Sequence, residues 1–399
     1  MAGIASVTGG RRFADNRQVT ATSSNPADRD LPILPTGAQL PIQQAIADAG
    51  GWLGFDSFME MALYLQGVGY YAHASRKFGL MPLSGSDFAT APEMSPHFGR
   101  ALASQVLEAL VVTGTSEVWE FGAGSGALAE QLLQVLGDAV SSYTIVDISS
   151  SLRERQQHKL AAFGSKVRWL KALPAKMRGI VVGNEVLDAM PAKLLVRKEG
   201  RWHERGVAMH EGRFVYADQP TVLCPPFEIE GSHDYLTEIH PQAEGFVRTL
   251  ADRLADGAVF LVDYGFPEHE YYHPQRSMGT LMCHRAHLAD TDALADAGEK
   301  DITVHVNFTG IALAGQEAGL RVAGYTGQGR FLLNCGLLDS PGDISLPERV
   351  MLQRLVNEHE MGELFKVIAL VAVGDAGRQS ALADWVPRGF ASGDRMHTL

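Results

Sequence analysis

The sequence is poor in cysteine, has a deficit of positive charge and contains no long apolar run, and each shortage excludes a class of protein. Its three cysteines, Cys224, Cys283 and Cys335, lie far apart without metal-ligand spacing, so they predict neither a disulfide framework nor a metal site. With 34 Lys and Arg against 46 Asp and Glu, the formal net charge is -12, which argues against a broad nucleic-acid surface. No segment approaches the roughly 18 consecutive apolar residues of a membrane span. We therefore expect no nucleic-acid partner, no membrane partner and no bound metal.

The first residues are rich in Arg, Ser, Thr, Asn and Asp and lack the apolar stretch of a secretory signal. We expect a disordered leader over residues 1–37 and a cytoplasmic location.

The rest of the chain has periodic patterns that predict an α/β protein. Helical patterns predict a helical N-terminal region at residues 38–112. From Glu117, apolar strand patterns alternate with helical ones, and such repeated βαβ units imply a parallel sheet with helices on both faces. The expected strands are residues 117–121, 143–148, 167–170 and 179–182, and the expected helices are 127–136 and 149–163.

The pattern changes after Pro191, where apolar and polar residues alternate. Turns at Glu199-Gly200 and Glu211-Gly212 predict an antiparallel β-meander inserted at residues 193–240. Beyond an irregular stretch expected at residues 267–302, the alternation of helix and strand resumes. We expect a Rossmann-like domain of residues 113–192 and 241–375 and a C-terminal tail of residues 376–399.

The strongest motif is Glu120-Phe-Gly-Ala-Gly-Ser-Gly126, between an apolar segment and a helical one. Glycines lack a Cβ atom, so the chain can turn sharply and a ligand can approach the backbone amides. Asp147 ends the next predicted strand, where a carboxylate can accept hydrogen bonds from both ribose hydroxyls of a nucleoside. This order predicts a nucleoside-binding half-domain. The predicted contacts in it are Glu120, Gly122, Ala123, Gly124, Gly126, Asp147 and Ile148.

A dinucleotide is the alternative ligand, because Gly122, Gly124 and Ala127 also satisfy the dinucleotide fingerprint. Three features favour S-adenosylmethionine. Glu120 suits a ligand with a cationic amino group and would repel a pyrophosphate, Gly126 gives the tighter glycine spacing, and the loop has no Lys or Arg for a phosphate. We predict a class I S-adenosylmethionine-dependent methyltransferase.

Asn184-Glu-Val-Leu-Asp-Ala-Met-Pro191 follows the fourth predicted strand, at the edge where open α/β sheets bind ligands. We expect Asn184 to contact the cofactor and Glu185 to face the reactive methyl group. Methyl transfer requires an aimed nucleophile, and a carboxylate can grip an arginine guanidinium bidentately. Glu185 is the first catalytic candidate and Asp188 the second. Helix capping is the alternative role of Asn184 and Asp188.

Two later residues are further candidates. His305 could reach the site as a proton acceptor, and Asp263, which ends the fifth predicted strand, could face the cleft. A structural role is the alternative for both.

Taken in order, these segments and others resemble the MidA family, proteins related to the mitochondrial complex I assembly factor that methylates arginine. The resemblance spans residues 40–373, and its specific parts are the segments Asp-Phe-x-Thr-x-Pro-Glu and Asn-Glu-x-x-Asp-Ala-x-Pro. The matching segments are Gly69-Tyr-Tyr71, Gly85-Ser-Asp-Phe-Ala-Thr-Ala-Pro-Glu-Met-Ser95 with Phe98-Gly99, Glu120-Phe-Gly-Ala-Gly-Ser-Gly126, Asn184-Glu-Val-Leu-Asp-Ala-Met-Pro191, Val262-Asp-Tyr-Gly265, Gly279-Thr-Leu281, His305-Val-Asn-Phe308, Gln328-Gly-Arg-Phe-Leu332 and Met361-Gly-Glu-Leu-Phe-Lys366.

The resemblance implies a seven-stranded methyltransferase sheet, a helical N-terminal region, S-adenosylmethionine as cofactor and a protein arginine as methyl acceptor. Asp147 stands where the family usually has Glu, and Asn307 replaces a common Asp. No family motif matches residues 196–240. On the loop expected to cover the cofactor, the predicted contacts are Gly69, Tyr70, Asp87, Thr90 and Glu93.

Three functions remain open. The first is methylation of a protein side-chain nitrogen, in arginine above all, and the second is methylation of a small molecule. The third is a non-catalytic assembly factor that binds the cofactor. A homodimer is the oligomer we consider.

Overall fold

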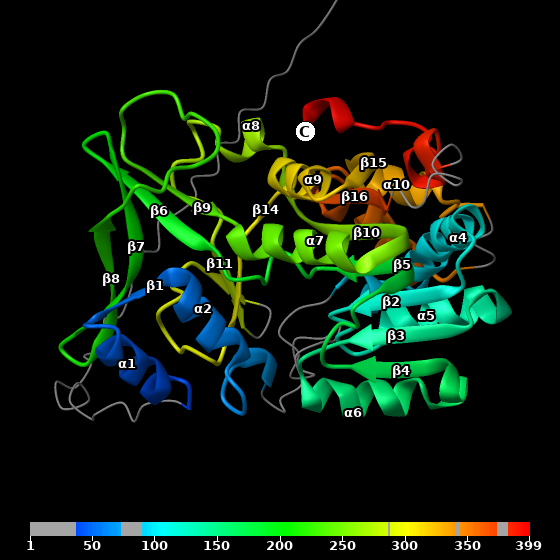
Figure 1. Cartoon of the computed structure of the whole chain (residues 1–399), viewed down its shortest axis with the longest axis horizontal. Coiled ribbons are helices and arrows are strands. Elements are labelled where there is room, and N and C mark those ends of the chain that lie inside the picture. Colours follow the sequence, from blue (N-terminus) through cyan, green and yellow to red (C-terminus); the bar gives the residue numbers. More distant parts are fainter. Residues whose placement is uncertain (1–36, 73–89, 286–287, 340–343, 373–381) are drawn as a thin grey trace, which may run out of the picture. The chain divides into compact units, whose positions relative to one another are not determined.

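A mixed β-sheet carries the segments that surround the predicted site (Figure 1). The computed structural model describes residues 37–72, 90–285, 288–339, 344–372 and 382–399. Within them the main sheet has eight strands, in the order β15-β16-β10-β5-β2-β3-β4, with β14 paired to β10 outside this path. The α/β class is as expected, but the sheet has one strand more than the seven expected. The strands are β2 (Glu117–Phe121), β3 (Ser142–Val146), β4 (Val167–Leu170), β5 (Met177–Asn184), β10 (Leu254–Phe266), β14 (Val306–Asn307), β15 (Leu320–Gly327) and β16 (Phe365–Ala372).

Helices cover both faces of this sheet. On one face lie α4 (Pro96–Thr113), α5 (Ala127–Leu136), α10 (Gln328–Asn334) and α11 (Leu346–Val356). On the other lie α7 (Pro241–Arg253) and α9 (Phe308–Glu317). Helix α3 (Ala91–Met94) precedes α4. Helices α6 (Ser150–Lys159), α8 (Glu268–Tyr271) and α12 (Met361–Leu364) lie between main-sheet strands in the chain, with 3-10 turns at Gly137–Ala139 and Ala161–Lys166.

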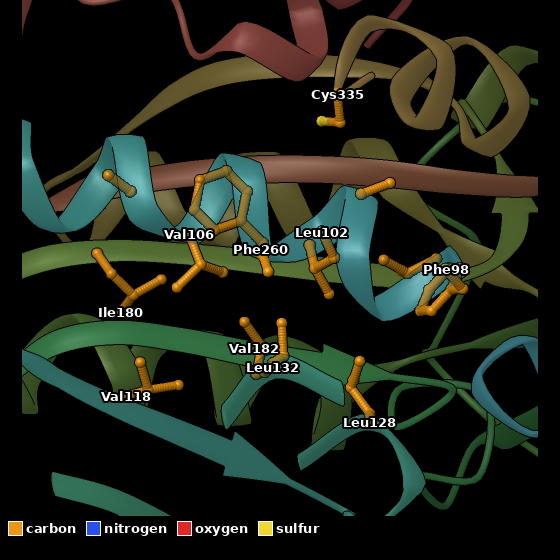
Figure 2. Packing of buried hydrophobic residues seen from close by; sticks show 14 of the residues in the cluster. Phe98, Leu102, Val106, Val118, Leu128, Leu132, Ile180, Val182, Phe260 and Cys335 are labelled. Atoms are coloured by element: carbon orange, nitrogen blue, oxygen red, sulfur yellow. The ribbon is translucent and has the colours of Figure 1, made fainter. Parts of the chain in front are cut away.

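The alternation of side chains along the strands explains why the sheet is buried on both sides. In β10, Phe260 faces the core under α4, whereas its neighbours Val259 and Leu261 face the core under α7 and α9. Figure 2 shows Leu102 and Val106 of α4 directed at the strands. Among the described residues, no helix is both long and apolar enough to cross a membrane.

Helix α4 shows how local sequence sets the ends of an element. Ser95 precedes it and its side chain accepts a hydrogen bond from the backbone N–H of His97, while Pro96 occupies the first turn. Gly114 ends it with a φ of 59°, a left-handed conformation that glycine adopts without steric cost.

A second module combines three distant segments around its own core of side chains such as Phe58, Leu194 and Ile302. A five-stranded antiparallel sheet contains the three predicted strands of the meander. Two strands were not predicted: β9, and β1 from the N-terminal region. The sheet consists of β1 (Trp52–Gly54), β6 (Lys193–Lys198), β7 (Arg201–His210), β8 (Arg213–Pro220) and β9 (Tyr235–Ile239).

Two helices and a small sheet complete this second module. The helices are α1 (Gln39–Asp48) and α2 (Phe55–Tyr64), followed by a 3-10 turn at Tyr70–Ala72. The stretch expected to be irregular contains β11 (Met282–Arg285), β12 (Leu288–Asp290) and β13 (Asp301–Thr303), which form a three-stranded sheet. The predicted N-terminal region therefore divides, with α1 and α2 in this module and α4 on the main sheet.

The end of the chain packs on the main sheet. Phe390 is buried against Phe331 of α10, and Arg321 of β15 donates hydrogen bonds to the carbonyls of Leu382 and Trp385. Residues 382–399 are thus part of the folded unit, with 3-10 turns at Arg388–Phe390 and Met396–Thr398.

Candidate active site

A cavity of about 560 Å³ opens where the carboxyl ends of β2, β3, β5 and β10 meet. The second module supplies another part of its wall, from α2, the 3-10 turn after it, β11 and β13. The site is therefore built between the two modules at the sheet edge expected for an open α/β fold.

The glycine loop after β2 forms one end of the cavity. Gly122, Gly124 and Gly126 have φ values of 62°, 52° and 82°, which side chains with a Cβ atom rarely adopt. Gln156 of α6, completely buried, donates from Nε2 to the carbonyl of Gly124 at 2.9 Å and to Oδ2 of Asp147 at 2.8 Å. This glutamine, which the sequence analysis missed, holds the loop and the acid of the next strand together.

Asp147 follows β3 and lines the cavity beside Ile148. Its Oδ1 accepts a hydrogen bond from the backbone N–H of Ser149 at 2.9 Å. Burial raises the pKa of this carboxyl, and its hydrogen bonds with Ser149 and Gln156 oppose that shift. Within the described part of the chain, each oxygen accepts one hydrogen bond, and a second lone pair on each suits a pair of ribose hydroxyls.

Glu120 lies in β2 with only 2% of its surface exposed. Tyr143 of β3 donates from its hydroxyl to Oε2 of Glu120 at 2.7 Å. Burial nevertheless raises the pKa of Glu120 to about 8. A cation placed beside this carboxylate would compensate for the cost of desolvating its charge.

The segment before α4, which includes α3, contacts the glycine loop. Thr90 and Glu93 line the cavity, and Ser125 in the glycine loop donates from its hydroxyl to the Glu93 carboxylate. The glycine loop thus has a partner on the covering segment.

Beside the glycine loop, the turn after β5 is strained and firmly held. Glu185 has a φ of 55°, rare for a residue other than glycine, and its backbone N–H donates to the carbonyl of Val262 at 2.8 Å. Oδ2 of Asp263 accepts hydrogen bonds from the backbone N–H groups of residues 186, 187 and 188 at 3.0, 2.8 and 3.3 Å. Asp263 therefore fixes the turn.

Several acidic side chains converge at and around this turn. Glu185, Asp188 and Asp301 all line the cavity. Burial, followed by the charge of Asp263, raises the pKa of Glu185 to about 8 and that of Asp188 well above its ordinary range. Asn184 donates from Nδ2 to Oε1 of Glu185 at 2.8 Å.

The lining contains many carboxylates and neither lysine nor arginine among the described residues. No three His, Cys, Asp or Glu side chains in the described part are arranged to hold a metal ion. Among the described lining residues, a pyrophosphate would meet carboxyl groups and no Lys or Arg, whereas a sulfonium with an amino group fits. The carboxylates of the lining are Glu60, Glu93, Glu120, Asp147, Glu185, Asp188 and Asp301.

The comparisons with known proteins agree with this geometry. A family of S-adenosyl-L-methionine-dependent methyltransferases matches residues 101–326 of the chain. The chain belongs to this methyltransferase family. Its methyl donor is S-adenosylmethionine, as predicted.

A Burkholderia thailandensis protein, solved as a crystal structure bound to S-adenosyl-homocysteine, has 44% sequence identity to this methyltransferase. The match covers 93% of this chain and 100% of that chain, with a TM-score of 0.84. A native crystal structure of a Burkholderia thailandensis protein is 43% identical over the same shares, with a TM-score of 0.80. The curated relative from Danio rerio, the mitochondrial protein arginine methyltransferase NDUFAF7, is 26% identical over 81% of this chain and 84% of its own. The resemblance inferred from the sequence is confirmed.

Most predicted site residues of the methyltransferase come together in the cavity. The lining includes Thr90, Glu93, Glu120, Gly122, Ala123, Gly124, Asp147, Ile148, Asn184, Glu185 and Asp188. Asp87 lies outside the described residues. Helix capping by Asn184 or Asp188 was a wrong alternative, since the segment after β5 forms turns and no helix.

Four predicted residues do not line the cavity of the methyltransferase. Gly69 packs so closely on the end of α2 that a Cβ atom would lie 2.5 Å from a backbone nitrogen, and Tyr70 is buried in the second module. Gly126 precedes α5 beside Gln156. His305 stacks on Tyr264, which lines the cavity in its place.

Burial explains why His305 is unsuited to the predicted role of proton acceptor. It lowers the pKa of the ring to about 4, with contributions from the charges of Arg276 and Lys366. Asp263 is likewise absent from the lining, because its oxygens serve the backbone.

We expect the affinity of the methyltransferase for S-adenosylmethionine to rise with pH. The pKa of Glu120 is raised to about 8, so the carboxyl is protonated in the free protein below that pH, and a cationic ligand must displace the proton. Affinity should increase by up to about tenfold per pH unit from pH 6 and level off near pH 8. Calorimetry at pH 6, 7 and 8 measures this slope.

Two variants test whether Glu120 causes the slope. Glu120→Gln should make the affinity nearly independent of pH, because the amide does not titrate. Glu117→Gln changes a carboxylate of the same strand that pairs with Arg168 outside the cavity, so the slope should persist. An unchanged slope in Glu120→Gln would assign it to another group.

Proposed function

We propose that this methyltransferase methylates arginine side chains of a protein substrate. The observation that carries the proposal is the cluster of carboxylates Glu185, Asp188 and Asp301 in the cavity wall, of which Asp188 and Asp301 are buried. Asp301 raises the pKa of Glu185 and of Asp188, and Glu185 raises that of Asp188, so a cationic group that enters between them relieves this repulsion.

Guanidinium is the cation that suits this cluster best. It stays protonated at any physiological pH and presents five N–H donors in one plane, which match carboxylates bidentately. The curated relatives from Danio rerio and Homo sapiens are named protein arginine methyltransferases, at 26% and 25% identity.

The step is a displacement at carbon. The donor supplies a methyl carbon bound to a sulfonium. As the carbon–sulfur bond breaks, a guanidinium nitrogen forms the new bond to that carbon and sulfur keeps the electron pair as a neutral thioether. The nitrogen then loses one proton to a cavity carboxylate and from there to solvent. Glu185 and Asp188 hold the remaining N–H groups and so aim this nitrogen.

The second module supports a large substrate. It supplies Glu60 and Asp301 of the lining and extends well beyond the cavity as a five-stranded sheet. The homodimer and the cytoplasmic location stay predictions, and the curated relatives are mitochondrial proteins.

Incubation with a radiolabelled methyl donor in an extract of cells that lack the gene tests the proposal. We expect label in protein, released as methylated arginine after hydrolysis, and no label with the Glu185→Gln variant. Label on lysine or in small molecules would overturn the arginine assignment. Tight donor binding without any transfer would favour the non-catalytic assembly factor.

A further inference from the structure

Two stacked tyrosines form a wall of the cavity, in the same lining as Asp188 and Asp301. Tyr64 ends α2 and Tyr71 lies in the 3-10 turn after it, and both line the cavity. Their ring centroids are 5.6 Å apart and the ring planes differ by 17°. Their neighbour Tyr70, the predicted contact, lies in the core instead.

The proton of each tyrosine hydroxyl already forms a hydrogen bond within the protein. Tyr64 donates to the backbone carbonyl of Ala189 at 2.7 Å, and Tyr71 donates to Oδ1 of Asp301 at 2.9 Å. Burial, with the charges of Asp301 and Asp188, raises both phenol pKa values well above 10, so both groups stay protonated. A phenol has one proton, and each oxygen can therefore only accept a hydrogen bond from a ligand.

Neighbouring polar atoms have the same character. One N–H of the Asn184 amide donates to Glu185, and the buried Oδ1 of Asn184 has no partner among the described residues. Oδ1 of Asp188 is also buried and unpartnered within the described part. The two tyrosine hydroxyls thus have no free proton to donate, and these two carbonyl or carboxyl oxygens lie in the same wall.

We infer that Tyr64 and Tyr71 determine acceptor specificity by accepting hydrogen bonds from N–H groups of the arginine guanidinium. The inference rests on the proposed function and deepens it. Hydroxyls that can only accept hydrogen bonds favour a group that only donates, as guanidinium does. They disfavour a carbonyl or carboxylate placed beside them, which would leave buried lone pairs facing each other.

The matching ligand pair is the arginine peptide found by labelling and the same peptide with citrulline in place of that arginine. Citrulline has nearly the same shape, but a carbonyl oxygen replaces one N–H₂ group. In the presence of S-adenosyl-homocysteine, calorimetry should show the arginine peptide binding at least about 100-fold more tightly, as expected when one buried charged contact is lost. Equal binding of the two peptides would overturn the inference.

The variants Tyr64→Phe and Tyr71→Phe remove only a hydroxyl and keep the ring stack. Each should weaken arginine-peptide binding and raise its KM by about tenfold, since one hydrogen bond to a charged group is lost. Affinity for S-adenosylmethionine should stay within about twofold, because the glycine loop and Glu120 are unchanged. Tyr235→Phe is the matched control, since that hydroxyl donates to the carbonyl of His273 outside the cavity.

The outcomes separate this inference from the proposed function. If the wild type labels and binds the arginine peptide but both Phe variants bind it equally well, the role of the tyrosines is wrong and the arginine assignment stands. If the wild type labels another kind of acceptor, both fall. Equal weakening by Tyr235→Phe would show a general loss of packing and would also overturn the inference.

Discussion

The Glu185→Gln variant should bind S-adenosylmethionine within about twofold of the wild type and lose at least about 100-fold in kcat/KM for the acceptor. The amide has the shape of the carboxyl group, and its Oε1 can still accept the hydrogen bond from Asn184. The turn, held through Asp263, should keep its conformation. The variant removes the ability to become negatively charged and replaces one carboxyl oxygen with an NH2 group, which only donates.

That lost charge acts on the acceptor. Burial raises the pKa of Glu185 to about 8, so the free enzyme holds a fraction of it protonated at neutral pH, and a guanidinium favours the ionised form. In the wild type, kcat/KM should therefore rise from pH 6 toward pH 8, as the carboxylates of the cluster ionise together. In Glu185→Gln this rise should be smaller, since one ionisable group is gone.

The measurement is initial rates with the labelled arginine peptide between pH 6 and pH 9, alongside donor affinity by calorimetry. Glu204→Gln serves as the control, because that carboxylate pairs with Lys193 away from the cavity. Its kcat/KM should not change. Wild-type rates in Glu185→Gln would remove Glu185 from the mechanism.

Local sequence was sufficient to predict elements whose pattern is long and regular. Strand β2 and helix α5 have the predicted bounds, because an apolar strand and a helical stripe flank glycines that fix where each ends. The turns of the meander were also readable. Glu199, Gly200, Glu211 and Gly212 all have positive φ values, as tight hairpins of right-handed twist require.

Local sequence patterns did not predict the pairing of strands that lie far apart in the chain. Strand β1 has three residues and pairs with β7, which lies about 150 residues later in the chain. Strands β11 and β13 have four and three residues, and their alternation is too brief to separate from loop sequence. Their stability comes from the core they share with α2, and a single segment does not reveal this core.

The same distinction holds for the site. Asp147 and Glu185 could be predicted because each directly follows a parallel strand, and the carboxyl ends of parallel strands share one edge. Gln156, Tyr64 and Asp301 come from a helix, another helix and a short distant strand, so only packing brings them to that edge. His305 was expected in the cavity, but its ring stacks on Tyr264, and Tyr264 lines the cavity instead. Sequence spacing does not reveal such a stack.

The affinity of the Gly124→Val variant for S-adenosylmethionine should fall by at least about 100-fold. A valine at this position strains the glycine loop and fills space that faces the ligand. Gly124 has a φ of 52°, where a β-branched residue is strongly disfavoured. It lines the cavity, and its carbonyl accepts the hydrogen bond from Gln156 that connects the loop to Asp147. A valine must therefore either shift this carbonyl and disturb Asp147 or place its methyl groups in the space of the ligand.

A glycine with comparable strain elsewhere separates the effect on the ligand from the effect on stability. Gly200 has a φ of 75° in the turn between β6 and β7, and a Cβ atom there would meet nothing within 4 Å. Gly200→Val should lower the melting temperature through backbone strain, because the left-handed conformation costs about 1–2 kcal/mol for such residues. Its donor affinity should equal that of the wild type. If Gly124→Val, folded by circular dichroism, binds S-adenosylmethionine as the wild type does, the glycine loop does not hold the donor. Loss of binding in both variants would instead trace the effect to instability.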